Sequence, residues 1–416
     1  MIIEGTCDVC GRSLRLVHDF GPQPMCNDLR TGAPRFPLIL TVCVVCGLVQ
    51  LDDSSRVPQE MVFPRSYPYR SRHSSQLREE ASALAALMAQ GRPPKEPGKM
   101  TVVLDVGCND GTFLNAFAKE GFRTYGVDPT DAILDCDSRH VISQCYLSDQ
   151  PIVWDSGAVL GHGLLTKPNG QVLKWPGFSI VMAHNVFAHV PNPVGFAKNM
   201  VQLLHPQGVL VVSNHALESI LYGGQWDTIY HEHRRYYSES TLTHTLRLAG
   251  IEVKGTRHTK VHGGSVCVQG QRYTGEVGPP LGTRRELDDF ADFSGRVESS
   301  RAKLQEVVRS DWGRRPVILA GVPSRAGTLI SCCGFTRDDI AMAVEPSGSV
   351  KIGGFLPGTE IPIVDEAVAP GEAAVLVGAH HLGPPFVRKM LARFGGPAIT
   401  PFPYPIIYTS QEMGNV

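Results

Sequence analysis

Residues 102–113 most constrain the fold of this chain, because an apolar run containing Asp105 is followed at once by two glycines, Gly107 and Gly111. A second apolar run comes next and ends in Asp128. This order predicts a strand, a tight turn, a helix and a second strand that ends in a carboxylate, which is a nucleotide-binding half-fold. The glycines let the turn pass close to a ligand at the helix N-terminus, where Asp128 would accept hydrogen bonds from ribose hydroxyls.

The spacing of the glycines restricts the ligand. Gly107 and Gly111 form a Gly-x-x-x-Gly pattern, whereas a dinucleotide fold carries Gly-x-Gly-x-x-Gly. A cofactor without a pyrophosphate needs fewer glycines, and S-adenosylmethionine is such a cofactor. We therefore expect S-adenosylmethionine, with a nicotinamide-dependent oxidoreductase as the rival class. Many α/β proteins also carry a strand-glycine-helix unit for packing alone.

Length and charge set the broad class. A chain of 416 residues predicts two or three domains, and a formal net charge of −1 argues against nucleic acid or a membrane surface as the main partner. The N-terminus has no cationic region before an apolar run, and no apolar stretch is long enough to span a bilayer. Eleven cysteines suit a reducing compartment. We expect a cytoplasmic protein with a small-molecule partner, and the oligomeric state stays open.

Four cysteines are arranged in pairs. Two Cys-x-x-Cys motifs, each followed by glycine, are separated by a span that can fold back as short strands, and they consist of Cys7, Cys10, Cys43 and Cys46. This spacing is typical of a tetrahedral four-thiolate zinc site, which leaves no open coordination position and is therefore structural. The alternative is a set of unrelated buried or redox cysteines. Cys26, between the pairs, receives no metal role.

The segments around the half-fold extend it into a larger sheet. Residues 75–90 have apolar spacing typical of a helix, and residues 92–99 indicate a linker into the nucleotide fold. Residues 136–177 are rich in turn formers, and we assign them no chemistry. The pattern beyond them predicts a doubly wound sheet with a strand at 178–185, a helix at 191–204 and a strand at 209–213.

Polar residues follow the ends of these predicted strands. Asn185 ends one strand, His189 comes shortly after it, and His215 follows the next strand. Ligands of such sheets bind beyond the C-terminal strand ends, so we expect these side chains beside the cofactor. For each histidine the alternative is a structural hydrogen bond.

The densest group of proton-transfer side chains is Tyr230, His231, Glu232 and His233. A general base needs a tunable pKa and an orienting neighbour, and a Tyr/Glu/His cluster near a cofactor supplies both. One alternative is a zinc site, but the His-x-His spacing lacks the i, i+4 spacing of a hydrolase motif. Another is a structural loop held by hydrogen bonds. The cluster favours catalysis.

The ordered set of motifs resembles the three-part S-adenosylmethionine-dependent C-methyltransferases of sugar-nucleotide and antibiotic deoxysugar pathways. Known members methylate a carbon next to a ketone on a nucleotide-linked keto-sugar. The resemblance spans nearly the whole chain and rests on the four paired cysteines and on segments 67–71, 104–111, 185–189, 227–233, 261–265, 321–328 and 356–362.

This resemblance implies an α/β protein with a small N-terminal zinc module, a central Rossmann-like class I methyltransferase sheet and a C-terminal Rossmann-like domain. The expected ranges are 1–65, 66–262 and 263–416. The implied cofactor residues are Asp105, Gly107, Asn109, Gly111, Asp128 and Asn185. The implied catalytic residues are Tyr67, His189, Tyr230, Glu232 and His233, and the implied substrate residues are Tyr69, His262, Arg325 and Glu345.

The C-terminal part also reads as a nucleotide-binding half-fold on its own pattern. An apolar strand at 317–321 is followed by a small-residue loop and by a second strand that ends in Glu345. Packing alone is the alternative. We expect this domain to hold the nucleotide or other handle of the acceptor, with Arg325 as a phosphate contact.

The expected reaction begins with removal of a proton next to a carbonyl group. Our hypothesis is that His233, with Tyr230 and Glu232, takes or relays this proton, while His189 or Tyr67 stabilises the enolate oxygen. Departures from the family pattern near the acceptor side leave a non-sugar acceptor open. A zinc-containing scaffold without activity is the non-enzymatic alternative.

Overall fold

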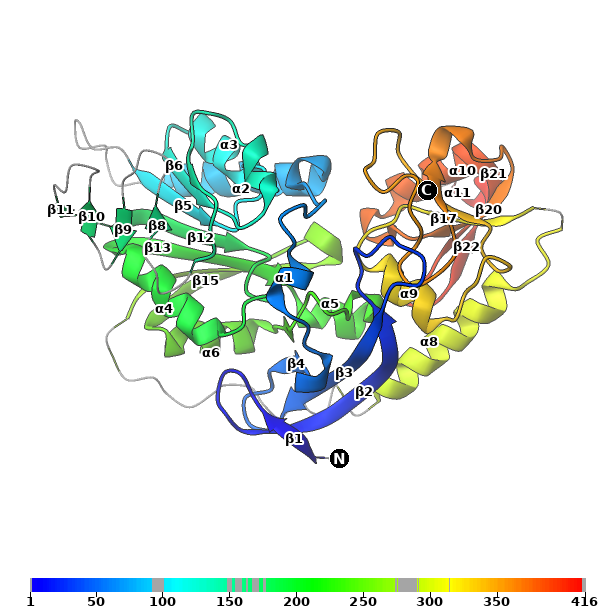
Figure 1. Ribbon diagram of the computed structural model, residues 1–416, viewed down its shortest axis with the longest axis horizontal. Helices are drawn as coiled ribbons and strands as arrows, with labels where there is room; N and C mark the ends of the chain where they lie inside the picture. Colours follow the sequence, from blue (N-terminus) through cyan, green and yellow to red (C-terminus); the bar gives the residue numbers. More distant parts are fainter. Residues whose placement is uncertain are drawn as a thin grey trace.

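The computed structural model describes residues 2–91, 101–147, 177–273, 292–313 and 315–413, with residues 275 and 290 and four short strands between 152 and 174. A small N-terminal sheet lies below and between two larger sheets, one central and one C-terminal (Figure 1). Across the described ranges, no helix combines the length and apolar character that a membrane crossing requires. The expected linker at 92–99 lies outside the described residues.

The N-terminal sheet has the strand order β1-β2-β3-β4-β14. It is built on a long antiparallel ladder between β2 and β3, which runs from the pair Leu14 and Cys43 to the pair Pro24 and Arg35. Its last strand comes from far along the chain and pairs with β4. The strands are β1 (Ile2–Thr6), β2 (Ser13–Pro24), β3 (Arg35–Cys43), β4 (Val49–Leu51) and β14 (Arg235–Tyr236).

The central sheet has seven strands in the order β15-β16-β13-β12-β5-β6-β7. Strands β13, β12, β5, β6 and β7 run parallel, and β15 and β16 close one edge as an antiparallel pair. The bounds are β5 (Val102–Val106), β6 (Arg123–Val127), β7 (Val141–Ser143), β12 (Phe178–His184), β13 (Leu204–His215), β15 (Ile251–Thr259) and β16 (Ser265–Arg272).

Helices cover both faces of this sheet, because apolar residues alternate between its two sides. Val103 packs with apolar residues of one helix pair, and its neighbour Leu104 packs with those of the other pair. The first pair is α2 (Ser75–Gln90) and α3 (Thr112–Lys119), and the second is α4 (Pro193–Leu203) and α6 (Glu239–Leu248).

The C-terminal sheet is also doubly covered and has the order β19-β18-β17-β20-β21-β22. Its helices are α8 (Phe293–Val308) and α9 (Ala326–Cys332) on one face and α10 (Pro384–Phe394) on the other. The strands are β17 (Val317–Ala320), β18 (Met342–Glu345), β19 (Ile363–Asp365), β20 (Ala373–Val377), β21 (Gly395–Thr400) and β22 (Ile406–Tyr408).

Smaller elements complete the described chain. A separate antiparallel sheet has the order β11-β10-β9-β8 and the strands β8 (Ile152–Val153), β9 (Val159–Gly161), β10 (Leu164–Thr166) and β11 (Val172–Lys174). The short helices are α1 (Gln59–Val62), α5 (Leu217–Tyr222) and α11 (Ser410–Met413).

The predicted fold class is confirmed, and the predicted helix at 75–90 matches α2 residue for residue. Strand β13 is longer than the predicted 209–213, because it already begins at Leu204. Pro206 has no amide hydrogen for the ladder, and a register shift between Phe178 and Ile180 on the partner strand accommodates the irregular stretch. Pro206 therefore lies within an irregular part of β13, although the sequence predicted that the strand begins after it.

A buried ion pair joins the central and C-terminal parts. The carboxylate of Asp227 is fully buried and accepts bonds from Arg325 Nε at 2.9 Å, Arg325 Nη2 at 2.7 Å and His380 Nε2 at 2.9 Å. Burial opposes ionisation, but Arg325 and His380 outweigh it and lower the pKa of Asp227 to about 2. The hydroxyl of Thr328 adds a bond to the Ile229 carbonyl.

Arg325→Met is expected to lower the free energy of unfolding by about 3–5 kcal/mol, because it leaves the buried Asp227 charge without its main partner. Chemical denaturation measures the loss. The double variant Arg325→Met/Asp227→Leu should lose less than the single variant. Arg309→Met, which breaks an exposed pair with Asp339, is the control and should cost about 0–1 kcal/mol. Equal losses at both arginines would contradict this role.

Candidate active site

The four paired cysteines form a compact sulfur cluster. The sulfurs of Cys7, Cys10, Cys43 and Cys46 lie within 4.8 Å of one another. The distance is 3.5 Å between Cys7 and Cys46 and 3.4 Å between Cys10 and Cys43. A tetrahedral site with zinc-sulfur bonds of about 2.3 Å requires sulfurs of this separation. Backbone amides of Val9 and Val45 also point at these sulfurs. The donor set therefore fits a closed, structural zinc ion.

The glycine turn after β5 forms a cradle for a ligand. Gly107 has a φ of 78°, and a Cβ atom built there would lie 2.5 Å from Val186 Cγ2. Its amide donates to the Val127 carbonyl at 2.7 Å, which ties the turn to the neighbouring strand. Asp128, at the end of β6, accepts the Asn109 amide at 2.9 Å. The turn and the acid are therefore one connected unit, and the predicted order of strand, turn, helix and second strand is present.

Three residues other than glycine have a positive φ among those that the structure describes. They are Asn109 at 51°, Asn185 at 55° and His262 at 56°, and all three line the same cavity. Such conformations are costly and persist where the surroundings enforce them, which is common at functional sites. The Asn109 side chain also bonds the Tyr69 carbonyl and the Ser71 amide, so it fixes the loop before α2.

One continuous cavity of about 1950 Å³ is lined by all three parts of the chain. It includes Asn27 from the N-terminal part, Gly107 and Asp128 from the central part, and Glu345 and Lys351 from the C-terminal part. A pocket for one small ligand usually measures about 300–1,000 Å³. The cavity thus has room for a cofactor and a second, sizeable molecule.

The segment after Asp227 brings a tyrosine and a histidine together in this cavity. Tyr230 Oη lies 3.0 Å from His233 Nε2, and the His233 ring also bonds the Thr228 carbonyl. The ring of His189 lies 5.1 Å from that of His233, and its Nδ1 lies 2.6 Å from the Glu232 carbonyl. Because a carbonyl oxygen only accepts, Nδ1 of His189 donates in this contact, and the ring also bonds the Asn185 backbone.

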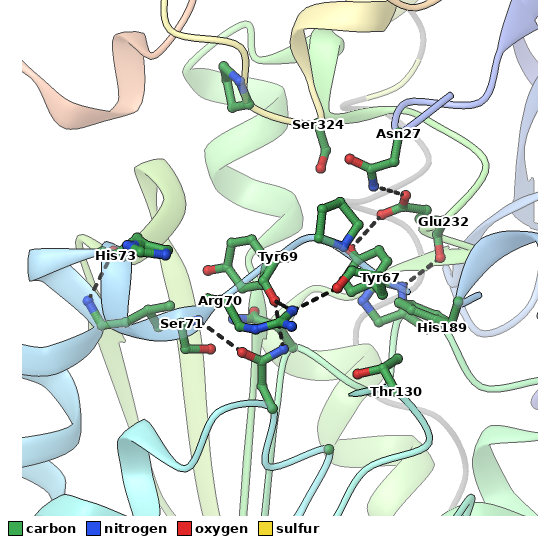
Figure 2. Close-up of a pocket in the computed structure, with 18 of the residues that line it drawn as sticks. Asn27, Tyr67, Tyr69, Arg70, Ser71, His73, Thr130, His189, Glu232 and Ser324 are labelled. Atoms are coloured by element: carbon green, nitrogen blue, oxygen red, sulfur yellow. Dashed lines mark hydrogen bonds between the residues drawn. The ribbon is translucent and has the colours of Figure 1, made fainter. Parts of the chain in front are cut away.

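Glu232 is held by three donors from two segments that are distant from it in sequence. Its Oε1 accepts Asn27 Nδ2 at 2.5 Å and Cys26 Sγ at 2.8 Å, and its Oε2 accepts the Tyr67 hydroxyl at 3.2 Å. Figure 2 shows the Asn27, Glu232 and Tyr67 side chains pointing towards one another. The sequence prediction therefore placed Tyr67 and Glu232 in the site but missed Asn27.

Burial shifts the acid-base groups of the cavity away from their usual pKa values. It lowers the pKa of His189 to about 4 and that of His233 well below its usual value, so both rings are neutral near pH 7. It raises the pKa of Glu232 and of both tyrosines, Tyr67 and Tyr230. Burial and the neighbouring Asp128 raise the pKa of Asp105 to about 8. Such shifts concentrate at sites of proton transfer.

The C-terminal half-fold repeats the construction of the cofactor turn. The amide of Gly321, after β17, donates to the Val344 carbonyl at 3.0 Å, and the Val322 amide donates to Glu345 at 2.6 Å. Ser349 donates to the other Glu345 oxygen, and the Lys351 amine bonds the Val322 carbonyl. A second acid-and-turn unit thus faces the cavity.

The remaining predicted substrate residues also line the cavity. Tyr69 and His262 do so from the central part, and Arg325 does so from the C-terminal part. Arg325 is already bonded through Nε and Nη2 to Asp227 and Gln225, which leaves Nη1 for a ligand. Its structural role was not foreseen from the sequence.

Models of three protein families match consecutive parts of the chain. The description "Putative zinc binding domain" covers residues 7–63, "Methyltransferase domain" covers 70–254, and "C-methyltransferase C-terminal domain" covers 260–403. The chain is a three-part S-adenosylmethionine-dependent C-methyltransferase. In this C-methyltransferase the sulfur cluster lies within the match to the zinc-binding model, and the glycine turn lies within the match to the methyltransferase model.

Relatives agree with this assignment to different extents. The C-methyltransferase NovU of Streptomyces niveus is 26% identical over 437 residues, which cover 98% of this chain and 97% of the relative. A ubiquinone biosynthesis O-methyltransferase of Histophilus somni is 31% identical, but over 27% of this chain and 43% of the relative. The solved 1,6-didemethyltoxoflavin-N1-methyltransferase of Burkholderia thailandensis is 14% identical, with a TM-score of 0.34 over 56% and 96% of the chains.

Cys43→Ser is expected to abolish stoichiometric zinc binding by this C-methyltransferase, because a three-thiolate site loses its closed tetrahedral set. Elemental analysis of purified protein gives the zinc content per chain. Cys26→Ser is the matched control and should keep about one zinc ion, because Cys26 bonds Glu232 and lies outside the sulfur cluster. Zinc loss in the control, with Cys43→Ser unchanged, would refute the ligand assignment.

Gly107→Ala should weaken binding of S-adenosylhomocysteine at least about 10-fold, because the new methyl group strains the backbone and overlaps Val186. Isothermal titration calorimetry measures the Kd. Gly121→Ala is the matched control, since Gly121 has the same φ of 78° but open space around its Cβ position. The prediction fails if the two variants bind the ligand equally well.

Proposed function

We propose that this C-methyltransferase transfers a methyl group to a carbon next to the ketone of a nucleotide-linked keto-deoxysugar, through an enolate. The observation that carries the proposal is the pair of acid-and-turn units, at Asp128 and at Glu345, that face one cavity. Each unit offers a carboxylate at a strand end, where ribose hydroxyls are usually bound. Two such units in a cavity of about 1950 Å³ support one cofactor and one nucleotide-bearing acceptor.

The central unit is the proposed cofactor site. Gly107 lets the turn approach the ligand, Asp128 offers its carboxylate to the ribose, and Asp105, Asn109 and Asn185 complete the lining. Gly111 does not line the cavity: it caps the start of α3 with a φ of 76°, and a Cβ atom there would meet Cys136. When bound, S-adenosylmethionine supplies an electrophilic methyl group on its sulfonium. The protein therefore has to create a carbon nucleophile and hold it in line with that methyl group.

The acid-base residues are suited to creating this nucleophile. The His233 ring bonds the Thr228 carbonyl, so its Nε2 accepts a hydrogen bond from the Tyr230 hydroxyl. In the proposed step the proton of the acceptor carbon passes to Tyr230 Oη while the hydroxyl proton passes to His233 Nε2. The C–H electrons then form the enolate double bond, and the ketone oxygen gains the negative charge. We assign stabilisation of that oxygen to Tyr67, whose hydroxyl turns from Glu232 Oε2 to the enolate oxygen, because the one ring proton of neutral His189 is held by the Glu232 carbonyl.

The proposed acceptor site lies on the C-terminal side. Glu345 lines it from the C-terminal part, and Tyr69 and His262 line it from the central part. His262 is in a strained conformation with a φ of 56°. We keep the ranges 1–65, 66–262 and 263–416 as the proposed zinc, cofactor and acceptor domains. Strand β14 does not follow these ranges. Its residues fall within 66–262, but it pairs with β4 of the N-terminal sheet.

The proposal predicts enolisation without methyl transfer. With S-adenosylhomocysteine in place of the cofactor, the hydrogen next to the ketone of a nucleoside diphosphate-linked keto-deoxysugar should exchange with deuterium from D₂O. The double variant Tyr230→Phe/His233→Gln should slow the exchange by about 10²–10⁴-fold, the usual contribution of general acid-base catalysis. Mass spectrometry of the recovered sugar measures the exchange.

The control is the Kd of S-adenosylhomocysteine, which should be the same in the double variant and in the unchanged protein. Normal methyl transfer by the double variant would overturn the assignment of the base. Absence of both exchange and methylation in the unchanged protein, despite cofactor binding, would reject this acceptor class and favour a non-sugar acceptor.

A further inference from the structure

We propose that Asn27 and Cys26 of the zinc module are positioning residues of the methyl-transfer site, which hold the Glu232 carboxylate against Tyr67. This inference rests on the proposed function, because that function assigns the enolate oxygen to Tyr67, the hydrogen-bond partner of Glu232. It assigns the zinc module a task in the reaction in addition to its structural one.

The contacts are short and converge on one carboxylate oxygen. Asn27 Nδ2 lies 2.5 Å and Cys26 Sγ 2.8 Å from Glu232 Oε1, so both lone pairs of that oxygen have a donor. The Tyr67 hydroxyl lies 3.2 Å from Oε2, which keeps one further lone pair. Glu232 and Cys26 are 3% and 6% exposed, so water is largely excluded from these bonds. The carboxylate is thereby fixed with Oε2 directed to Tyr67.

The zinc module determines where Asn27 lies. The β2–β3 ladder begins at the predicted zinc ligand Cys43 and ends at the pair Pro24 and Arg35. Pro24 stands two residues before Cys26 and three before Asn27. Nine residues of β3 span roughly 30 Å, so the ladder carries the loop from the zinc cluster to the cavity. Figure 1 shows this hairpin reaching towards α9 of the C-terminal part.

The end of the β2–β3 ladder that lies near Asn27 is bonded both to the C-terminal part and to the segment that carries Glu232. Arg35 Nη1 donates to Ser331 Oγ at 2.7 Å, and the Phe355 amide donates to the Leu29 carbonyl at 2.9 Å. His231 Nε2 donates to the Pro37 carbonyl at 3.1 Å. Pro37 belongs to β3 and His231 directly precedes Glu232, so this bond attaches the Glu232 segment to the ladder. The donors and the carboxylate are thus mounted on one framework, which suits precise positioning.

Several titratable groups surround Glu232 from different elements. Cys26 belongs to the loop after β2, Tyr67 to the loop before α2, Tyr230 to the same segment as Glu232, and Lys351 to the C-terminal part. Burial raises the pKa of Glu232, whereas the bonds from Cys26, Asn27 and Tyr67 and the charge of Lys351 lower it. Removing the Asn27 donor leaves burial less opposed and therefore raises this pKa further.

The test compares Asn27→Leu, which removes the donor at similar volume, with Arg30→Ala in the same loop. Arg30 is a suitable control because it is exposed and pairs with Asp28. With a nucleoside diphosphate-linked keto-deoxysugar, Asn27→Leu should lower kcat by about 10²-fold, the cost of a misplacement of about 1 Å. The acid limb of its pH profile should move to higher pH. Zinc content and the Kd of S-adenosylhomocysteine should not change.

A second measurement does not depend on the acceptor. Infrared difference titration of the full-length zinc protein with bound S-adenosylhomocysteine follows the Glu232 carboxyl band, identified by its loss in Glu232→Gln. Its midpoint should move to higher pH in Asn27→Leu and in Cys26→Ala, and Cys26→Ser should restore it because serine keeps a donor. If the unchanged protein methylates no keto-sugar, the proposed function fails while this titration still tests the positioning. Unmoved midpoints in folded Asn27→Leu and Cys26→Ala would overturn the inference.

Discussion

The arrangement of this C-methyltransferase depends on the buried carboxylate of Asp227. A buried charge requires partners, and both partners of Asp227, Arg325 and His380, belong to the C-terminal part. Asp227 stands three residues before Tyr230, so the bond that joins the two large sheets also fixes the start of the acid-base segment. The pKa values of His189 and Tyr230 in the cavity are shifted chiefly because their side chains are buried.

The central and C-terminal sheets hold their glycine turns by the same pattern of hydrogen bonds. In each, the glycine turn after one strand bonds to the neighbouring strand, and the acid at the end of that neighbour accepts an amide from the turn. The equivalent residues are Gly107 with Asp128 and Gly321 with Glu345. A turn held at both ends presents its ligand-facing atoms without reorganisation, which lowers the entropy lost on binding.

Local patterns made much of this structure predictable, and contacts between distant residues made the rest unpredictable. Helix α2, the zinc cysteines and the glycine turn each carry their information within a few neighbouring residues. Asn27 has no such signal, because its partner Glu232 is 205 residues away and an asparagine after a strand usually indicates a turn. The pairing of Arg325 with Asp227 was hidden for the same reason: an arginine in a small-residue loop suggests a phosphate as readily as a carboxylate.

Strand β14 has a consequence for exchanging parts between related enzymes. Arg235 and Tyr236 pair with β4 of the N-terminal sheet, so the chain leaves the central domain at the acid-base segment and returns to it afterwards. A chimaera joined near residue 65 would therefore combine one parent's zinc module with the other parent's β14 and Glu232. Successful grafts should transfer residues 2–63 together with residues 226–237, as a single discontinuous unit.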